Sequence, residues 1–158
     1  MILPAPAFVP VEGRRLRVGY ISSDLRDHPV ARNLGTILAN HDRSRFEVFC
    51  YADLALPDEY SLKLRGAVDG WRQINGMSDE RVAQAVRADA IDILVCVAGR
   101  FDRNRPLVAA YRPAPVQVSL YDIATSGIAE MDFLLADRAL VPRRGSERFV
   151  ERVFGLPH

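Results

Sequence analysis

The feature that most limits how this chain folds is a run of eight residues, 91–98, that is apolar at every position except Asp92. The run does not alternate between apolar and polar residues, so it predicts a strand that is covered on both faces of its sheet. Such strands occur in parallel sheets whose connecting helices lie on both sides. The remainder of the chain must therefore supply neighbouring strands and covering helices.

That remainder alternates short apolar runs with segments whose apolar residues recur at helical spacing. The strand-like runs are residues 16–22, 46–52, 71–74, 116–120 and 132–136. The helical segments are residues 29–41, 57–68, 78–90 and 106–111, and we expect a last helical turn or two at residues 147–153. This rhythm predicts βαβ units and an α/β fold, a three-layer α/β/α, Rossmann-like domain with a mostly parallel sheet.

The 158 residues suffice for one domain with a real core. Residues 1–15 hold three prolines and little periodicity, so we read them as a linker or lead-in and residues 16–158 as the domain. The start has no basic stretch and is broken by proline, and no apolar run approaches the ~20 residues of a membrane span. We therefore expect a cytoplasmic protein with no signal peptide and no membrane partner.

Charge and residue spacing argue against several classes of function. The 21 basic and 20 acidic residues leave a net charge of +1, which disfavours binding of nucleic acid by phosphate neutralisation. Cys50 and Cys96 lie inside strand-like runs and are expected to be buried, reduced thiols. No metal-ligand spacing, glycine-rich dinucleotide fingerprint or Walker A motif occurs. We expect no metal site and no classical binding of NAD or ATP.

In a doubly wound sheet the ligand crevice lies outside the carboxyl ends of the strands. The loops that meet this description are residues 22–29, 52–57, 75–78, 99–105 and 121–130. His28 lies between a strand end and a helix start, where an imidazole can serve as base or hydrogen-bond donor near neutral pH, or can simply cap the helix. His41, near the end of that helix, is expected to be structural.

Two further loops carry candidate binding residues. Residues 99–105 hold three arginines, which suit an anion such as a phosphate or an acidic acceptor, but which also suit a solvated loop. Residues 121–127 combine small hydroxyl side chains with a glycine, a composition that permits close approach of a ligand to the backbone but also makes an ordinary turn.

Several segments, in order and in spacing, resemble one family. They are residues 16–24 (Leu-Arg-Val-Gly-Tyr-Ile-Ser-Ser-Asp), 27–29 (Asp-His-Pro), 45–51, 90–95 with Gly99, 112–117 (Arg-Pro-Ala-Pro-Val-Gln), 125–127 (Thr-Ser-Gly), 131–133 and 136–137. Together they resemble the start of the catalytic region of O-linked N-acetylglucosamine transferases and their SPINDLY-like bacterial relatives. The resemblance covers residues 16–158.

The resemblance implies the first of two Rossmann-like lobes that face each other across a cleft, without the second lobe and without the tetratricopeptide array that usually precedes it. The implied reaction is an inverting, metal-independent transfer of a sugar, N-acetylglucosamine, from a UDP-sugar to a serine or threonine of a protein acceptor. The UDP-sugar is a substrate held mainly by the second lobe, no cofactor is expected, and the isolated chain is expected to be inactive.

The same resemblance implies site residues. The family histidine that matches His28 lines the active site, so we assign His28 the catalytic position, orienting the acceptor or acting as base. We expect substrate contacts from residues in the matching loops: Asp27, Pro29, Gly99, Arg100, Tyr121, Thr125, Ser126 and Gly127.

The sequence departs from the family pattern at three places. The family form Trp-Leu-Gly-Tyr-Pro-Gly-Thr-Ser/Thr-Gly, whose backbone packs around the donor sugar, reads Ser-Leu-Tyr-Asp-Ile-Ala-Thr-Ser-Gly at residues 119–127. Residues 98–102 read Ala-Gly-Arg-Phe-Asp in place of an Asn-Gly pattern, and Arg87 lies near the place of a family histidine. These departures motivate a second hypothesis, a non-catalytic relative that acts as a protein-interaction module. A third is a free-standing regulatory or ligand-binding domain whose crevice is complete within the chain.

Overall fold

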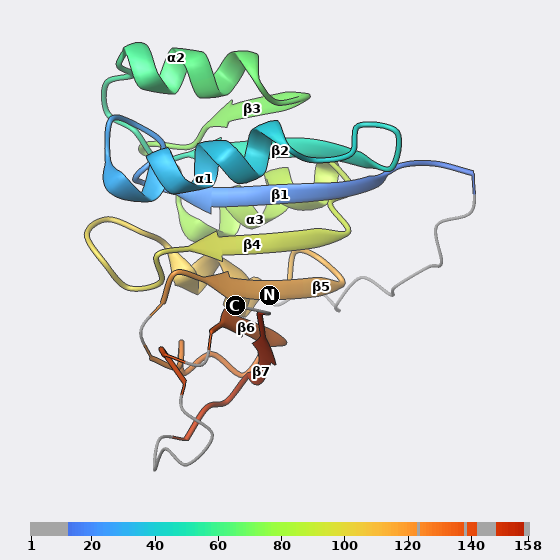
Figure 1. Ribbon diagram of the computed structural model, residues 1–158, viewed down its shortest axis with the longest axis vertical. Helices are drawn as coiled ribbons and strands as arrows, with labels where there is room; N and C mark the ends of the chain where they lie inside the picture. The colour runs from blue at the N-terminus through green and yellow to red at the C-terminus, as the bar shows by residue number, and fades with distance from the viewer. Residues whose placement is uncertain (1–12, 123, 138, 142–147, 157–158) are drawn as a thin grey trace.

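The computed structural model of the protein describes residues 13–122, 124–137, 139–141 and 148–156. Seven strands form one sheet in the order β3-β2-β1-β4-β5-β6-β7, and every pair of neighbours is parallel (Figure 1). The strands are β1 Leu16–Ser22, β2 Phe46–Ala52, β3 Gly70–Gln73, β4 Ile93–Val97, β5 Val116–Leu120, β6 Phe133–Ala136 and β7 Arg152–Gly155. The helices are α1 Pro29–Ala39, α2 Glu59–Gly66, α3 Asp79–Ala88 and the 3₁₀ helix η1 Pro106–Tyr111.

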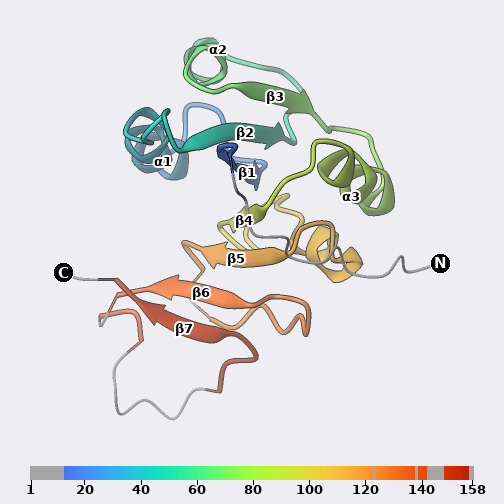
Figure 2. The ribbon, with the colours of Figure 1, turned by 90° about the vertical axis from the view of Figure 1, so that its right-hand side faces the viewer.

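The helices cover both faces of the sheet, as the continuous apolar runs predict. Figure 2 shows α1 and α3 on opposite sides of the strands. One apolar core joins α1 and α2 to the sheet, and the other joins α3 and η1 to its opposite face. The predicted three-layer, Rossmann-like α/β/α architecture is confirmed.

Local signals place the starts of the three α-helices. Pro29 occupies the first turn of α1 after His28, the N-cap residue. Asp58 and Ser61 form a reciprocal capping box at the start of α2, two residues later than the sequence suggests. The Ser78 side chain accepts a hydrogen bond from the Arg81 backbone N–H at the start of α3, as predicted.

Asp92, the polar exception in the central apolar run, is buried by pairing. Its carboxylate accepts two hydrogen bonds of 2.8 Å from the Arg14 guanidinium and one of 2.8 Å from the Arg17 backbone N–H. Burial works to raise the pKa of Asp92, but the hydrogen bonds from Arg14 and Arg17 outweigh it and hold that pKa below its ordinary value.

The prediction of a final helical turn at residues 147–153 was wrong. Residues 152–155 form β7, which pairs in parallel with β6 from Phe133↔Arg152 to Ala136↔Gly155, and residues 148–150 are not helical. Residues 142–147 lie outside the described part of the chain. A single turn of helix has little stability of its own, whereas the free edge of β6 offers a full set of backbone hydrogen bonds.

Both cysteines are buried and unpaired, as expected. Burial raises the pKa of the Cys50 thiol and that of the Cys96 thiol to about 12. No helix in the described residues is long and apolar enough to cross a membrane.

The sheet changes direction of growth between the neighbouring strands β1 and β4. From β1 the chain builds outward through β2 to β3, and from β4 it builds the other way through β5, β6 and β7. Loops that follow adjacent strands at such a switch point diverge and leave a crevice outside the carboxyl ends of the strands. This arrangement brings the loop after β1 next to the loop after β4.

Candidate functional site at the carboxyl edge of the sheet

Asn104 joins the two loops that meet at the switch point. Its Oδ1 accepts hydrogen bonds of 2.8 Å from Ser22 Oγ and 2.8 Å from the Ser23 backbone N–H. Its Nδ2 donates to Asp24 Oδ2 at 2.9 Å. Sequence reasoning missed Asn104, because an asparagine in a polar loop is the ordinary composition of a turn.

His28 lies at the start of α1, beside this network. Its Nδ1 accepts a hydrogen bond of 3.3 Å from the Val30 backbone N–H, so it caps the helix. About 35% of the side chain is exposed, and Nδ1 lies 3.9 Å from Asp24 Oδ1. The capping interpretation is therefore observed, and the exposed ring remains able to meet a ligand.

Asp27 and Pro29 flank His28 in the chain, and Asp27 contacts the starts of α1 and α2. The Asp27 carboxylate accepts hydrogen bonds of 3.0 and 2.8 Å from Arg32, and its backbone N–H donates to Asp58 Oδ2 at 2.7 Å. That backbone hydrogen bond is the largest cause lowering the pKa of Asp58. Asp27 lines a surface hollow of about 690 Å³ between the starts of α1 and α2.

The loop after β4 begins with two residues in the left-handed backbone region, Ala98 at φ 62° and Gly99 at φ 49°. Gly99 lies against the buried Asp122, so closely that a Cβ on Gly99 would overlap that carboxylate. Asp122 Oδ2 is buried without a hydrogen-bond partner among the described residues. The glycine is therefore required both by its backbone conformation and by its neighbour.

The three arginines of this loop differ in what they contact. Arg105 donates to Asp79 Oδ1 at 2.7 Å and lies 3.8 Å from Asp53, so it serves an internal ion pair. Arg100 is exposed and donates to the Thr125 carbonyl at 3.1 Å. Arg103 borders a hollow of about 330 Å³. Arg100 and Arg103, unlike Arg105, are placed to meet an anion.

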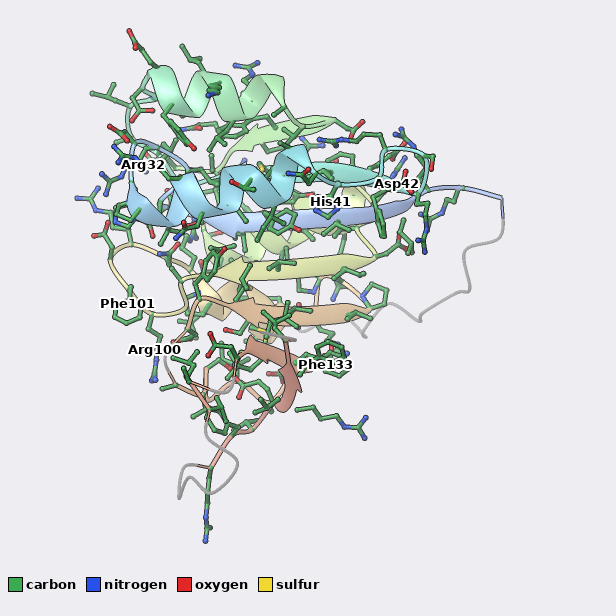
Figure 3. The ribbon with its side chains drawn as sticks, viewed as in Figure 1. Arg32, His41, Asp42, Arg100, Phe101 and Phe133 are labelled. Atoms are coloured by element: carbon green, nitrogen blue, oxygen red, sulfur yellow. The ribbon has the colours of Figure 1, made fainter. Side chains whose placement is uncertain are left out.

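Figure 3 shows how these residues lie in the fold. Arg32, Arg100 and Phe101 project at the edge where the strand arrows end, whereas Asp42 lies at the opposite edge. His41 is structural as expected, although α1 ends before it at Ala39. Its Nε2 lies 2.8 Å from Tyr20 Oη and its ring packs edge-on against Phe46.

The segment 121–127, in which substrate contacts are predicted, is bound by a buried acid, Glu151. Thr125 Oγ1 donates to Glu151 Oε2 at 2.7 Å, and the Ser126 backbone N–H donates to Glu151 Oε1 at 2.6 Å. Burial works to raise the pKa of Glu151, but these hydrogen bonds outweigh it and the pKa lies below its ordinary value. This role could not be predicted from the sequence, since Glu151 falls in the segment predicted to be helical.

The other residues of this segment have distinct environments. Ser126 Oγ accepts from the Ile128 backbone N–H at 3.2 Å, so its hydroxyl is also engaged. Tyr121 adopts a φ of 60°, is half-buried, and has its pKa raised by burial. Gly127 is exposed at φ 70° with open space around it, as a close approach of ligand to backbone requires.

His28 is thus linked through Asp24 and Asn104 to the loop after β4, which holds Gly99 and Arg100. Arg100 and Ser126 line a hollow of about 540 Å³ that Asn104 also borders. Asp27 opens on a separate hollow, and Thr125 is anchored internally. Among the described residues no three His, Cys, Asp or Glu side chains cluster as metal ligands.

Comparisons with known proteins agree on one family. Residues 5–158 match the family described as glycosyl transferase family 41. The chain is 33% identical over 159 residues to a probable UDP-N-acetylglucosamine–peptide N-acetylglucosaminyltransferase SEC of Arabidopsis thaliana, covering 97% of this chain and 16% of that protein. It is 36% identical over 165 residues to the UDP-N-acetylglucosamine–peptide N-acetylglucosaminyltransferase of Caenorhabditis elegans, covering 99% of this chain and 14% of that protein.

A solved structure gives the same answer at the level of fold. An O-GlcNAc transferase of Thermobaculum terrenum, the K341M mutant, superposes with a TM-score of 0.90 and 39% sequence identity. The match covers 98% of this chain and 30% of that one. This chain therefore spans only a small part of the length of the proteins it matches.

Proposed function

Because the chain belongs to glycosyl transferase family 41, we propose that it is the acceptor-side lobe of an enzyme that transfers N-acetylglucosamine from a UDP-sugar to serine or threonine of proteins. The observation that carries the proposal is the match to the Thermobaculum O-GlcNAc transferase, at a TM-score of 0.90 over 98% of this chain. We further propose that the longer protein has a second lobe, which would hold most of the UDP-sugar, and a tetratricopeptide array. We also propose that it is cytoplasmic.

The proposed chemistry is an inverting transfer without a metal or cofactor. The acceptor hydroxyl attacks the anomeric carbon from the face opposite the leaving UDP. Such a reaction is accelerated when the hydroxyl is aligned and the charge on the departing diphosphate is balanced. Arg100 and Arg103, at the carboxyl edge and free of the ion pair that engages Arg105, are cations that can contribute to that balance.

We assign roles to the site residues from their environments. His28, one-third exposed at the crevice, faces the acceptor hydroxyl. Gly99 and Gly127 offer backbone to the substrate, and Arg100 offers its guanidinium. Thr125 and Ser126 shape the loop beside the substrate, because Glu151 holds the Thr125 hydroxyl and the Ser126 backbone N–H in place. Asp27, Pro29 and Tyr121 form the surrounding wall.

The test uses the natural gene product, with whatever precedes and follows these residues. It is incubated with a panel of nucleotide sugars and a lysate of its own host, and proteins are examined by mass spectrometry. A shift of one N-acetylhexosamine that requires UDP-N-acetylglucosamine, and that is lost in His28→Ala, supports the proposal. A folded protein that transfers nothing from any donor would refute it.

The second candidate function is a non-catalytic protein-interaction module. The observation that favours it is the segment after β5. There Tyr121 holds a bulky side chain at a φ of 60°, and the Asp122 carboxylate fills the space beside Gly99. These side chains occupy the region where the family backbone approaches the donor sugar. Turnover with any nucleotide sugar would exclude this candidate.

A further inference from the structure

Asp24 is a buried carboxylate whose hydrogen bonding is incomplete. Its side chain is only 2% exposed. Oδ2 accepts from Asn104 Nδ2 at 2.9 Å, whereas Oδ1 has no hydrogen-bond partner among the described residues. A buried carboxylate oxygen is normally paired with a donor, so Oδ1 is placed for a donor that the present arrangement does not supply.

Two groups lie near that oxygen. His28 Nδ1 is 3.9 Å from Asp24 Oδ1, and Arg26 Nη2 is 4.0 Å away. Arg26 is partly exposed and lies closer, at 3.4 Å, to Asp102. The other two charged side chains near His28 are carboxylates, which accept hydrogen bonds from other groups. Asp27 accepts from Arg32, and Asp58 accepts from the Asp27 backbone N–H. His28 is therefore the donor that Asp24 is best placed to receive.

The tautomer of His28 decides whether its outer nitrogen can accept a proton. While Nδ1 accepts from the Val30 N–H, the neutral ring carries its hydrogen on Nε2, which is then a donor. In the other tautomer Nδ1 carries the hydrogen and Nε2 has a free lone pair. That tautomer needs an acceptor for Nδ1–H, and Asp24 Oδ1 is the nearby buried oxygen that lacks a donor.

We infer that Asp24 is a positioning residue that keeps part of the His28 population in the Nδ1–H tautomer in the free chain and selects that tautomer when substrate is bound. Hydrogen bonds of this kind are often long in ligand-free sites and shorten in the complex. The inference rests on the proposed function for its chemical step. In that step the acceptor oxygen bonds to the anomeric carbon, and the bond from that carbon to the diphosphate breaks as UDP leaves with the electron pair. The hydroxyl proton passes to His28 Nε2, and Asp24 stabilises the imidazolium through Nδ1–H.

Asp24→Asn reverses the hydrogen-bonding sense of this contact with little change in shape. The new amide oxygen can replace Oδ2 and accept from Asn104 Nδ2, which keeps the loops joined. The new amide nitrogen then takes the place of Oδ1 and donates to His28 Nδ1. The variant therefore favours the Nε2–H tautomer, in which Nε2 is no longer an acceptor.

The first test measures the tautomer in the 158-residue chain and needs no turnover. Long-range proton–nitrogen correlation spectra of the His28 imidazole are recorded at neutral pH for the wild type and for Asp24→Asn, with the amide spectrum reporting that each is folded. We expect a measurable Nδ1–H population in the wild type that disappears in the variant. A wild type wholly in the Nε2–H form would overturn the inference even if the variant failed to fold, as would equal Nδ1 shifts in the two proteins.

The second test measures kinetics in the longer natural enzyme. We expect Asp24→Asn to lower kcat roughly 100-fold or more with the KM for UDP-sugar little changed, and to have no further effect once His28 is alanine. Asp102→Asn, an exposed carboxylate that faces Arg26 rather than His28, is the matched control. An equal loss in both backgrounds would show a merely structural role. An enzyme without turnover would refute the proposed function, while the tautomer measurement would still decide the role of Asp24.

Discussion

Thr125 and Glu151, 26 residues apart, are joined by a hydrogen bond of 2.7 Å from Thr125 Oγ1 to Glu151 Oε2. The other carboxylate oxygen of Glu151 accepts from the Ser126 backbone N–H. Glu151 immediately precedes β7, so one buried acid attaches the loop after β5 to the edge of the sheet. The segment at residues 119–127, which departs most from the family pattern, is thus bound to the start of β7 through Glu151.

Glu151→Gln is expected to lower the free energy of unfolding by about 1–3 kcal/mol. The new amide nitrogen is itself a donor, so it would leave either the Thr125 hydroxyl or the Ser126 backbone N–H without an acceptor. Urea denaturation measures the change. Glu80→Gln, an exposed acid on α3, is the control and should stay within about 0.5 kcal/mol of the wild type. Equal stability of Glu151→Gln and the wild type would contradict the role given to Glu151.

Two substitutions of His28 separate its capping role from its catalytic role. His28→Ala removes the cap of α1 and should cost about 0.5–2 kcal/mol. His28→Asn supplies a side-chain oxygen at the same position and should restore most of that stability. Neither has a base, so both should lower kcat of the longer enzyme roughly 100-fold or more. Thermal unfolding and transfer assays, run in parallel, measure the two effects, and an active His28→Asn enzyme would remove the imidazole from the chemistry.

His41 is expected to make the fold sensitive to mild acid. Burial, assisted by the charge of Arg43, lowers the pKa of His41. The unfolded chain then binds a proton more readily than the folded chain, so this contribution to stability is complete above a pH of about 6.5 and is lost as the pH falls below it.

Urea denaturation at pH values of about 7.5 and 5 measures this dependence. His41→Gln should lower the free energy of unfolding by about 1 kcal/mol at the higher pH through its altered bond to Tyr20. Between the higher and the lower pH, the variant should lose less stability than the wild type. A variant with the same pH dependence as the wild type would assign the acid sensitivity to other groups.

Gly99→Ala should be among the most damaging single changes at the site. The residue combines a φ of 49° with contact against the Asp122 carboxylate, so the substitution adds steric overlap to backbone strain. Gly76→Ala is the matched control, because Gly76 has a φ of 79° and open space around it. The control should lose only about 1–2 kcal/mol, the strain alone, and Gly99→Ala should lose more. Equal losses in urea denaturation would show that the Asp122 contact adds nothing.

Hydrophobic pattern was enough to predict β1, β2 and β5 to the residue, because covered strands leave continuous apolar runs. It failed at β7, whose residues are all exposed. An edge strand of four residues owes its conformation to the neighbour it pairs with, and that neighbour is distant in sequence. Composition therefore gave no reliable sign of it.

The candidate site was predictable only in part. Position between a strand and a helix was enough to single out His28, and the three arginines of the loop at residues 99–105 pointed to Arg100. The resemblance added Gly99. Asn104 and Glu151 act through hydrogen bonds to loops that only the folded sheet brings near them. Asp24 lies in a segment that resembles the family, but the burial of its Oδ1 without a donor among the described residues depends on the fold and so could not be predicted from the sequence.

The amide of Asn104 gives the switch point a mechanical property. The loops after β1 and β4 begin where the two halves of the sheet grow apart, and this side chain bonds to Ser22, Ser23 and Asp24 across that divide. Neither loop can open without breaking those bonds or carrying the other with it. A ligand that displaces one loop is therefore expected to displace the other as well, so that the two loops respond to a ligand as one unit.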